Sequence, residues 1–160
     1  MTAHRQLLLL RHAKAAHGEG VADHERPLTE RGELAAAAMG RWLREQKVTL
    51  DAVWCSSALR ARQTWERAAS ALPAAPDASY LRELYQAGPD ELLDLVRQAP
   101  AQVRSLLVVG HNPTMQQTLE ELTDARHDFP TGALAVVGLA GAWSALASAR
   151  LLDFVRPKQL

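Results

Sequence analysis

Two histidines and two arginines that could handle a phosphoryl group follow apolar stretches of this sequence. Arg11 and His12 come directly after four leucines, and His111 follows the run Ser105–Gly110 in the same way. Arg60 comes shortly after another apolar segment. A guanidinium group matches phosphate oxygens with parallel N–H donors, and a neutral imidazole can act as a nucleophile. These four side chains predict a phosphate site.

The apolar runs predict strands that are covered on both faces. The leucines at residues 7–10 do not alternate with polar residues, which indicates a strand inside an α/β sheet. Ala52–Cys55 and Ser105–Gly110 show the same pattern. In open α/β sheets, ligands bind at the carboxyl ends of the strands. The histidines and arginines should therefore meet at one edge of the sheet.

The remaining segments predict crossover helices and a mixed sheet. Pro89 starts a helix that ends near Pro100, and residues 79–85 predict a short edge strand that runs into a loop. Residues 133–139 and 149–155 predict two strands that must pair antiparallel, because only a short turn joins them. Thr29 is the predicted N-cap of a helix to about Glu45, whose expected buried face is Ala35, Ala38, Met39, Trp42 and Leu43.

Two helix N-termini are expected to face the same edge. Ser56 and Ser57 are candidate N-caps of the helix that carries Arg60 and Arg62. A further helix is expected to begin at residue 113, with the asparagine before it as the cap. Free N–H groups at helix N-termini bind anions. Spacing alone does not choose between the two arginines.

Composition limits the classes of protein to which the chain can belong. Its 160 residues fit one domain, 1–160, and 18 basic against 18 acidic residues give no global field for nucleic acid or membrane. The single cysteine, Cys55, excludes an internal disulfide, and no signal peptide is recognised. His17 and His24 lie seven apart without a ligand pattern, so no metal or other cofactor is expected. We expect a cytoplasmic monomer.

Four ordered motifs resemble those of the histidine phosphatase superfamily, which is phosphoglycerate mutase-like, and are most similar to its SixA-type phosphohistidine phosphatases. The resemblance covers residues 7 to about 157. It implies a three-layer α/β/α sandwich around a mostly parallel, mixed sheet, in a small form without cap insertions. The motifs are Arg11-His12-Ala13-Lys14, Pro27-Leu28-Thr29-x-x-Gly32, Ser56-x-x-x-Arg60-Ala61-x-Gln63-Thr64 and Gly110-His111-Asn112-Pro113.

The resemblance also implies a mechanism. His12 attacks phosphorus and becomes phosphorylated, and water then releases phosphate. Arg11 and Arg60 would keep His12 neutral and would stabilise charge on the phosphoryl oxygens, to which His111 would donate. Of the two arginines, Arg60 falls at the family's motif position. Ala13 departs from the pattern, since many members have glycine there.

The general acid is the least defined residue. Glu83 is a candidate, although a surface role beside Arg82 explains it equally well. A phosphohistidine can leave as neutral imidazole without such an acid, whereas an alkyl phosphate needs one. The short span from Glu83 to residue 105 predicts a shallow, open site, which suits a phosphorylated protein. A phosphatase for small phosphomonoesters is the alternative, with Glu83 or Asp23 as the acid.

Two other classes can be weighed from the residues. A cysteine-dependent phosphatase places arginine six positions after its nucleophile, but Ala61 stands there relative to Cys55. A non-catalytic phosphate-binding module would have no use for a nucleophile between two arginines. The sequence leaves open whether Lys14 and Arg62 select substrates or are merely solvated.

Overall fold

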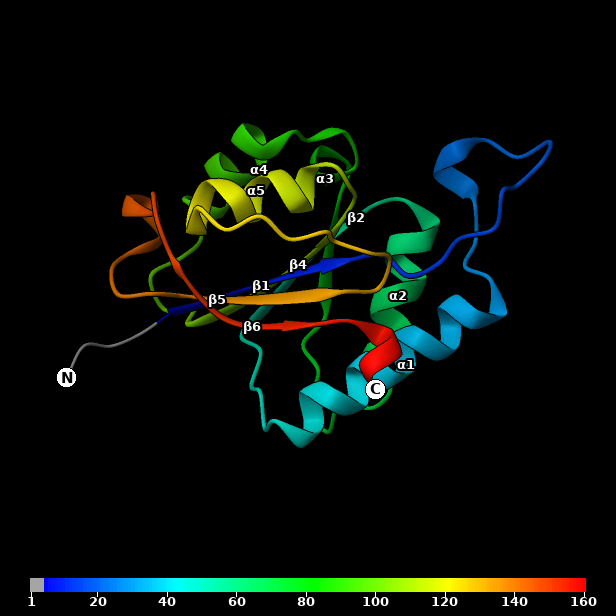
Figure 1. Ribbon diagram of the computed structural model, residues 1–160, viewed down its shortest axis with the longest axis horizontal. Helices are drawn as coiled ribbons and strands as arrows, with labels where there is room; N and C mark the ends of the chain where they lie inside the picture. Colours follow the sequence, from blue (N-terminus) through cyan, green and yellow to red (C-terminus); the bar gives the residue numbers. More distant parts are fainter. Residues whose placement is uncertain (1–4) are drawn as a thin grey trace.

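A six-stranded sheet runs through the centre of the protein, which is described by a computed structural model over residues 5–160 (Figure 1). In chain order the elements are β1 (Arg5–Arg11), the 3₁₀ helix η1 (Asp23–Glu25), α1 (Glu30–Glu45), β2 (Ala52–Ser56), α2 (Leu59–Ala69), β3 (Ala78–Leu81), α3 (Arg82–Gln86), α4 (Pro89–Val96), β4 (Ser105–Gly110), α5 (Thr114–Thr123), β5 (Leu134–Leu139), η2 (Trp143–Ala145), β6 (Arg150–Val155) and η3 (Pro157–Gln159).

The strand order confirms the mixed sheet that the sequence predicts. The order is β3-β2-β4-β1-β5-β6. Strands β3, β2, β4 and β1 are mutually parallel, whereas β5 runs antiparallel to both β1 and β6. Arg11 lies opposite Gly110 in the register of β1 and β4. The residues that follow these two strands are therefore neighbours.

The four leucines of β1 belong alternately to two cores. Leu7 and Leu9 pack with α4 and α5, and Leu8 and Leu10 pack with α1 and α2. All four are fully buried, as expected for an interior strand. Burial of each such side chain stabilises the fold by about 1.5–3 kcal/mol. Figure 1 shows the resulting layers, with α4 and α5 on one side of the sheet and α1 and α2 on the other.

Helix α1 is rotated slightly from the predicted orientation. Thr29 caps it as predicted and accepts a hydrogen bond from the Gly32 backbone N–H at 3.0 Å. The fully buried residues are Gly32, Ala36, Met39, Gly40 and Leu43, whereas Ala35, Ala38 and Trp42 are only partly buried. Gly40 explains this rotation of α1. A Cβ at Gly40 would lie 2.2 Å from the Ala68 carbonyl oxygen, so the glycine lets α1 and α2 approach closely.

Three predicted boundaries in the rest of the chain were wrong. Residues 82–86 form helix α3 rather than a loop, and α4 ends at Val96, before the turns that lead to Pro100. Helix α5 begins at Thr114. Asn112 still caps it, because its Oδ1 accepts a hydrogen bond from the Gln116 N–H at 3.1 Å.

The predicted serine caps of α2 were also wrong. Ala58 occupies the N-cap position, and no side chain caps the helix there. Ser56 instead ends β2, and its hydroxyl accepts a hydrogen bond from the Ala58 N–H at 3.2 Å. Cys55 is fully buried in the same strand, and burial raises the pKa of its thiol. Cys55 is therefore a core residue.

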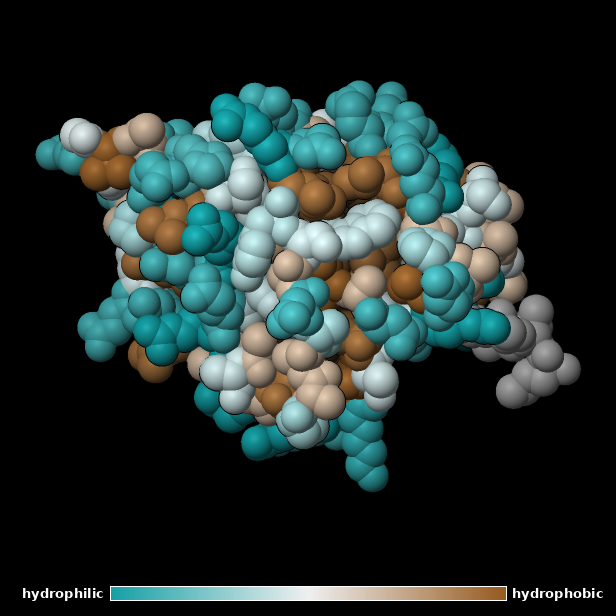
Figure 2. Space-filling view, turned by 180° about the vertical axis from the view of Figure 1, so that it is seen from behind, coloured by the Kyte–Doolittle hydropathy of each residue, from teal (hydrophilic) through white to brown (hydrophobic). Residues whose placement is uncertain are grey.

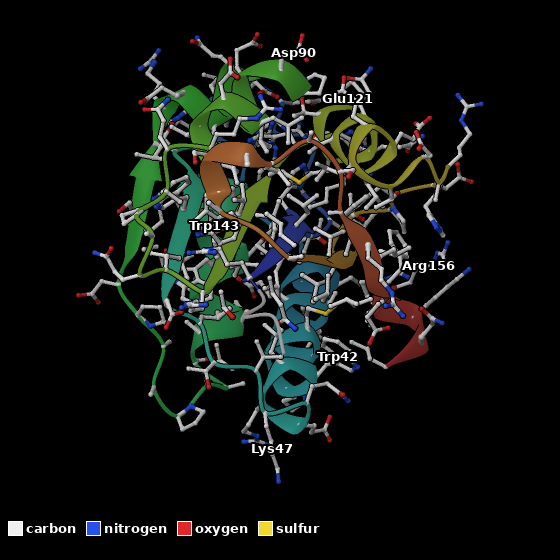
Figure 3. All side chains as sticks on the ribbon, turned by 90° about the vertical axis from the view of Figure 1, so that its left-hand side faces the viewer. Trp42, Lys47, Asp90, Glu121, Trp143 and Arg156 are labelled. Atoms are coloured by element: carbon white, nitrogen blue, oxygen red, sulfur yellow. The ribbon has the colours of Figure 1, made fainter. Side chains whose placement is uncertain are left out.

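The two edges of the sheet differ in what covers them. The loop of residues 12–29 extends beyond the carboxyl ends of the parallel strands, and its outer part protrudes at the right of Figure 1 and the upper left of Figure 2. At the opposite edge lies Trp143, which is labelled near the centre of Figure 3.

Within residues 5–160, no helix is long and apolar enough to cross a membrane.

Candidate active site

Strands β1 and β4 bring the two histidines together at the carboxyl edge of the sheet. The backbone N–H of His12 donates to the Gly110 carbonyl at 3.0 Å, so the strand pairing continues one residue past β1. The ring centroids of His12 and His111 lie 5.2 Å apart, with an angle of 52° between the planes. A phosphoryl group could therefore contact both rings.

His12 is held in the tautomer that a nucleophile needs. Its Nδ1 lies 2.8 Å from the carbonyl oxygen of Ala13. Because a carbonyl can only accept, Nδ1 carries the proton and Nε2 keeps a free lone pair. Burial, together with the nearby His111, Arg60 and Arg11, lowers the pKa of His12 to about 3, although the hydrogen bond to the Ala13 carbonyl acts in the opposite direction. Burial is thus the largest cause of its neutrality, ahead of the two arginines.

His111 is oriented by a residue whose role the sequence did not reveal. The Ser56 hydroxyl lies 2.8 Å from His111 Nε2 and already accepts the Ala58 N–H. When Ser56 donates its own proton to Nε2, the proton of His111 lies on Nδ1. That Nδ1 atom is buried and has no protein partner among residues 5–160. Burial, followed by the charge of Arg60, lowers the pKa of His111 to about 4.

The two arginines reach the site from different elements. Arg11 Nη1 donates to the Phe129 carbonyl at 2.9 Å, and its buried Nε has no protein partner in the described part of the chain. Arg60 lies in the first turn of α2 and is only 7% exposed. Arg62 is placed elsewhere, because its guanidinium lies over the Tyr80 ring, 5.5 Å from the ring centroid.

Asp23 fixes the Arg60 side chain from the loop after β1. Arg60 Nη1 donates to the Asp23 carbonyl at 2.8 Å, and Nη2 donates to Asp23 Oδ2 at 3.1 Å. The Tyr85 hydroxyl donates to the same Oδ2 at 2.7 Å, and Arg26 Nη1 donates to Oδ1 at 2.9 Å. The Tyr85 hydrogen bond and Arg60 lower the pKa of Asp23 to about 2. Asp23 therefore holds no proton at neutral pH.

Glu83 points to a different part of the surface. It is exposed on α3 and lines a groove of about 380 Å³ together with Gln86, Glu91 and Asp94 of α3 and α4. In the described part of the chain, no hydrogen bond or ion pair joins Glu83 to His12, His111 or Arg60. It remains only a candidate for the general acid.

The other motif residues hold the loop of residues 12–29 in place. Thr64 Oγ1 accepts from the Ala13 N–H at 3.0 Å and donates to the Arg60 carbonyl at 2.7 Å. Gln63 Oε1 accepts from the Leu28 N–H at 2.8 Å. A Cβ at Gly32 would lie 2.1 Å from the Lys14 carbonyl oxygen, so only glycine permits this approach.

The alanine at position 13 does not enter the site. Ala13 is fully buried and forms a small apolar cluster with Leu28 and Ala36. Its methyl group therefore packs inside the loop, which explains why the departure from glycine is tolerated. Among residues 5–160, no group of three or more His, Cys, Asp or Glu side chains is placed to hold a metal ion.

Comparison with known proteins identifies the class. Residues 7–85 match the family model described as "Histidine phosphatase superfamily (branch 1)". Phosphohistidine phosphatase SixA of Escherichia coli K12 is 35% identical over 138 residues, which cover 84% of this chain and 85% of the relative. The chain belongs to the histidine phosphatase superfamily.

Solved structures place it among the SixA-like members. A candidate SixA from Nakamurella multipartitia is 38% identical with a TM-score of 0.86, and 96% of each chain is covered. A protein histidine phosphatase SixA complexed with tungstate is 30% identical with a TM-score of 0.80, over 96% of this chain and 98% of the other. The α/β sandwich predicted from the sequence is thereby confirmed, and the protein is a phosphatase of this superfamily.

The Asp23 contact makes a specific prediction for activity. We expect Asp23→Asn to lower kcat/KM for phosphate release about tenfold, since Arg60 then loses its charge-assisted partner. Steady-state phosphate release measures this. Asp94→Asn is the matched control, because Asp94 is also exposed and ion-paired to an arginine at i+3 but lies outside the site. An equal loss in both variants would contradict the assigned role of Asp23.

The neutral histidines make a prediction for stability. His12 and His111 have lowered pKa values in the folded state, so the unfolded chain binds more protons below pH 6.5. The contribution of these two groups to the free energy of unfolding is therefore fully present above pH 6.5 and is lost as the pH falls toward 4. Between pH 7 and 5 we expect these two groups to reduce the free energy of unfolding by about 2–4 kcal/mol.

Urea denaturation at several pH values tests this expectation. His12→Asn should roughly halve the part of the pH dependence that these groups cause. His17→Asn, which removes an exposed loop histidine, should leave the dependence as it is. If the free energy of unfolding fell with pH equally steeply in the wild type and in His12→Asn, the assignment of His12 as a source of the pH dependence would be refuted.

Proposed function

We propose that this protein removes the phosphoryl group from phosphohistidine on another protein, through a covalent intermediate on His12. The observation that carries the proposal is the state of His12. The ring is neutral, its Nδ1 donates a hydrogen bond to the Ala13 carbonyl, and its Nε2 lone pair is free beside two guanidinium groups. A neutral nucleophile next to fixed cations is suited to attack on an anionic phosphoryl group.

In the first step His12 Nε2 attacks phosphorus. A bond forms between Nε2 and phosphorus, and the bond from phosphorus to the substrate imidazole breaks. The bond electrons stay on the departing nitrogen, and the distal ring nitrogen carries a proton taken from solvent, so a neutral imidazole leaves. Arg11 and Arg60 stabilise the charge on the transferring oxygens, and His111 Nδ1–H donates to one of them.

In the second step water attacks the phosphorus of phospho-His12. The bond from phosphorus to Nε2 breaks and its electrons return to His12, while inorganic phosphate leaves with the oxygen and protons of the water. Guanidinium groups supply the neutralisation in this scheme, which needs no metal. The complex of the SixA relative with tungstate, a tetrahedral oxyanion, supports oxyanion binding by this kind of protein.

The arrangement of carboxylates favours a nitrogen leaving group. An alkoxide needs a general acid, but Asp23 is ionised with a pKa of about 2, and within residues 5–160 Glu83 forms no hydrogen bond or ion pair with His12, His111 or Arg60. Imidazole leaves without such help. The span between β3 and β4 holds only α3 and α4, so no inserted cap encloses a small substrate. We further propose that residues 1–160 act as one domain, as a monomer in the cytoplasm.

Comparing two substrates tests the proposal. We expect rapid phosphate release from a phosphohistidyl protein and little from an aryl phosphate at equal concentration. His12→Asn, purified in parallel, controls for contaminating phosphatases. Efficient aryl phosphate turnover that Glu83→Gln abolishes would favour the phosphomonoester alternative, and turnover of neither substrate would favour a binding module.

A further inference from the structure

A groove of about 790 Å³ lies beside the site, between α1 and the end of the described chain. Lys14 of the loop after β1 lines it, together with four residues of α1 between positions 31 and 38 and four residues around η3 between positions 156 and 160. Residues 128–131 form a further part of its wall. Figure 1 shows η3, in red, against α1, in cyan, which brings distant parts of the sequence together.

The groove carries an excess of positive charge. Four cationic side chains line it, against one acidic side chain, that of Asp128; the four are Lys14, Arg31, Arg156 and Lys158. None of the four forms an ion pair within residues 5–160, and Arg156, labelled in Figure 3, lies over the Phe154 ring at 4.8 Å from the centroid. Because acidic and basic residues balance over the whole chain, this excess is local. Such a surface attracts a partner with carboxylates.

Apolar side chains are exposed along the same groove. Leu34 is 65% exposed and Leu160 is 48% exposed, and both line it with Ala35, Ala38 and Pro157. Exposed apolar surface bordered by charged groups marks an interaction site. A small anion would leave these leucines in water, whereas a peptide segment could cover them.

The groove is connected to the phosphate site through shared residues. The Phe129 carbonyl accepts hydrogen bonds from Arg11 Nη1 at 2.9 Å and from Asn112 Nδ2 at 3.1 Å. The Gly132 N–H, at the end of the same segment, donates to the His12 carbonyl at 2.9 Å. Lys14 lies two residues after His12. A substrate whose phosphoryl group is at His12 can therefore extend into the groove.

We propose that this groove docks the phosphorylated protein through a segment with carboxylates around an exposed apolar side chain. The inference rests on the proposed function, because it assigns the surface that recognises the phosphohistidyl protein beyond its phosphoryl group. The four cationic side chains favour a segment with negative charge, and Leu34 and Leu160 bind the apolar side chain of that segment. Recognition in the groove lowers KM, while His12, the arginines and His111 set kcat.

Two synthetic peptides test the docking surface. Each carries one histidine, phosphorylated with phosphoramidate, beside a leucine; one has aspartate and glutamate flanks, and the other has asparagine and glutamine at the same positions. We expect wild-type kcat/KM to be about tenfold higher for the acidic peptide, mainly through KM, and the preference to shrink as salt is added.

Reversing charges in the groove tests whether the preference for the acidic peptide arises there. In the R31E/K158E variant the acidic peptide should lose its advantage, while hydrolysis of the amide peptide changes less than about twofold. The matched control is R41E/R104E, which reverses two exposed arginines outside the groove and should keep the preference. Thermal unfolding of each variant verifies that it is folded.

The outcomes separate the two proposals. Equal hydrolysis of both peptides by the wild type, or a preference that survives in R31E/K158E, would overturn the docking surface and leave the proposed function standing. Hydrolysis of an aryl phosphate but of neither peptide would overturn the proposed function and this inference with it.

Discussion

Replacing His12 with asparagine should lower kcat for phosphate release on the order of 10⁴-fold or more, the scale seen when a covalent nucleophile is removed. Asparagine can still occupy the space near the Ala13 carbonyl, but it has no lone pair that can attack phosphorus. The residual rate would come from Arg11, Arg60 and His111 alone. Rapid quenching in base, where phosphohistidine survives, should detect phospho-His12 by mass in the wild type and not in the variant.

A second histidine serves as the control for this substitution. His127 stacks on Phe154, with ring centroids 5.0 Å apart, and does not contact the site histidines. His127→Asn should therefore keep kcat within about twofold of the wild type. A His12→Asn enzyme with near wild-type turnover, or a phosphoryl group on a residue other than His12, would refute the covalent mechanism.

Replacing Trp143 with alanine should reduce the free energy of unfolding by about 3–5 kcal/mol, as for other large aromatic residues removed from a core. Trp143 is 1% exposed, and its Nε1 donates to the Val103 carbonyl at 2.7 Å. The substitution leaves both a cavity and a carbonyl without its donor. Urea denaturation measures the loss, and Trp143→Phe, which fills most of the volume, should lose less.

The position of Trp143 allows stability and activity to be separated. Trp143 follows β5, which ends opposite Arg5 at the start of β1, whereas His12 follows the other end of β1. The two residues therefore lie at opposite ends of the strand, and kcat of the folded fraction should be unchanged. Trp42→Ala is the matched control, because Trp42 on α1 is only partly buried and should cost about 1–2 kcal/mol. Equal losses at both positions would contradict the assigned packing.

The central sheet and the four main site residues could be predicted because local patterns specify them. Four consecutive leucines at 7–10 fit a strand only where both of its faces are buried. This pattern predicts β1 and places His12 at its end. The second histidine follows from the same pattern at residues 105–110. Ala61, where a cysteine-dependent phosphatase would need arginine, counts against that class, and the order of four short motifs indicates the superfamily. These inferences need no knowledge of long-range contacts.

Contacts between segments distant in sequence could not be predicted in the same way. Asp23 meets Arg60 and Tyr85 only because the loop after β1 folds back, and α3 brings Tyr85 to it. Ser56 resembles an N-cap in sequence, yet its hydroxyl orients His111. The rotation of α1 depends on how closely Gly40 approaches Ala68, which is a tertiary property.

The free Nε of Arg11 and Nδ1 of His111 have a consequence for evolution. A buried donor without an acceptor destabilises the folded state by about 1–3 kcal/mol. Among residues 5–160 neither atom has a protein partner, so an apolar side chain at either position would remove this cost to stability, and it would also remove a group that the proposed mechanism uses to bind phosphoryl oxygens. Selection for heat resistance alone would therefore tend to erase the site. We therefore expect related chains that act on phosphoryl groups to retain these two residues, and loss of either residue to accompany loss of activity.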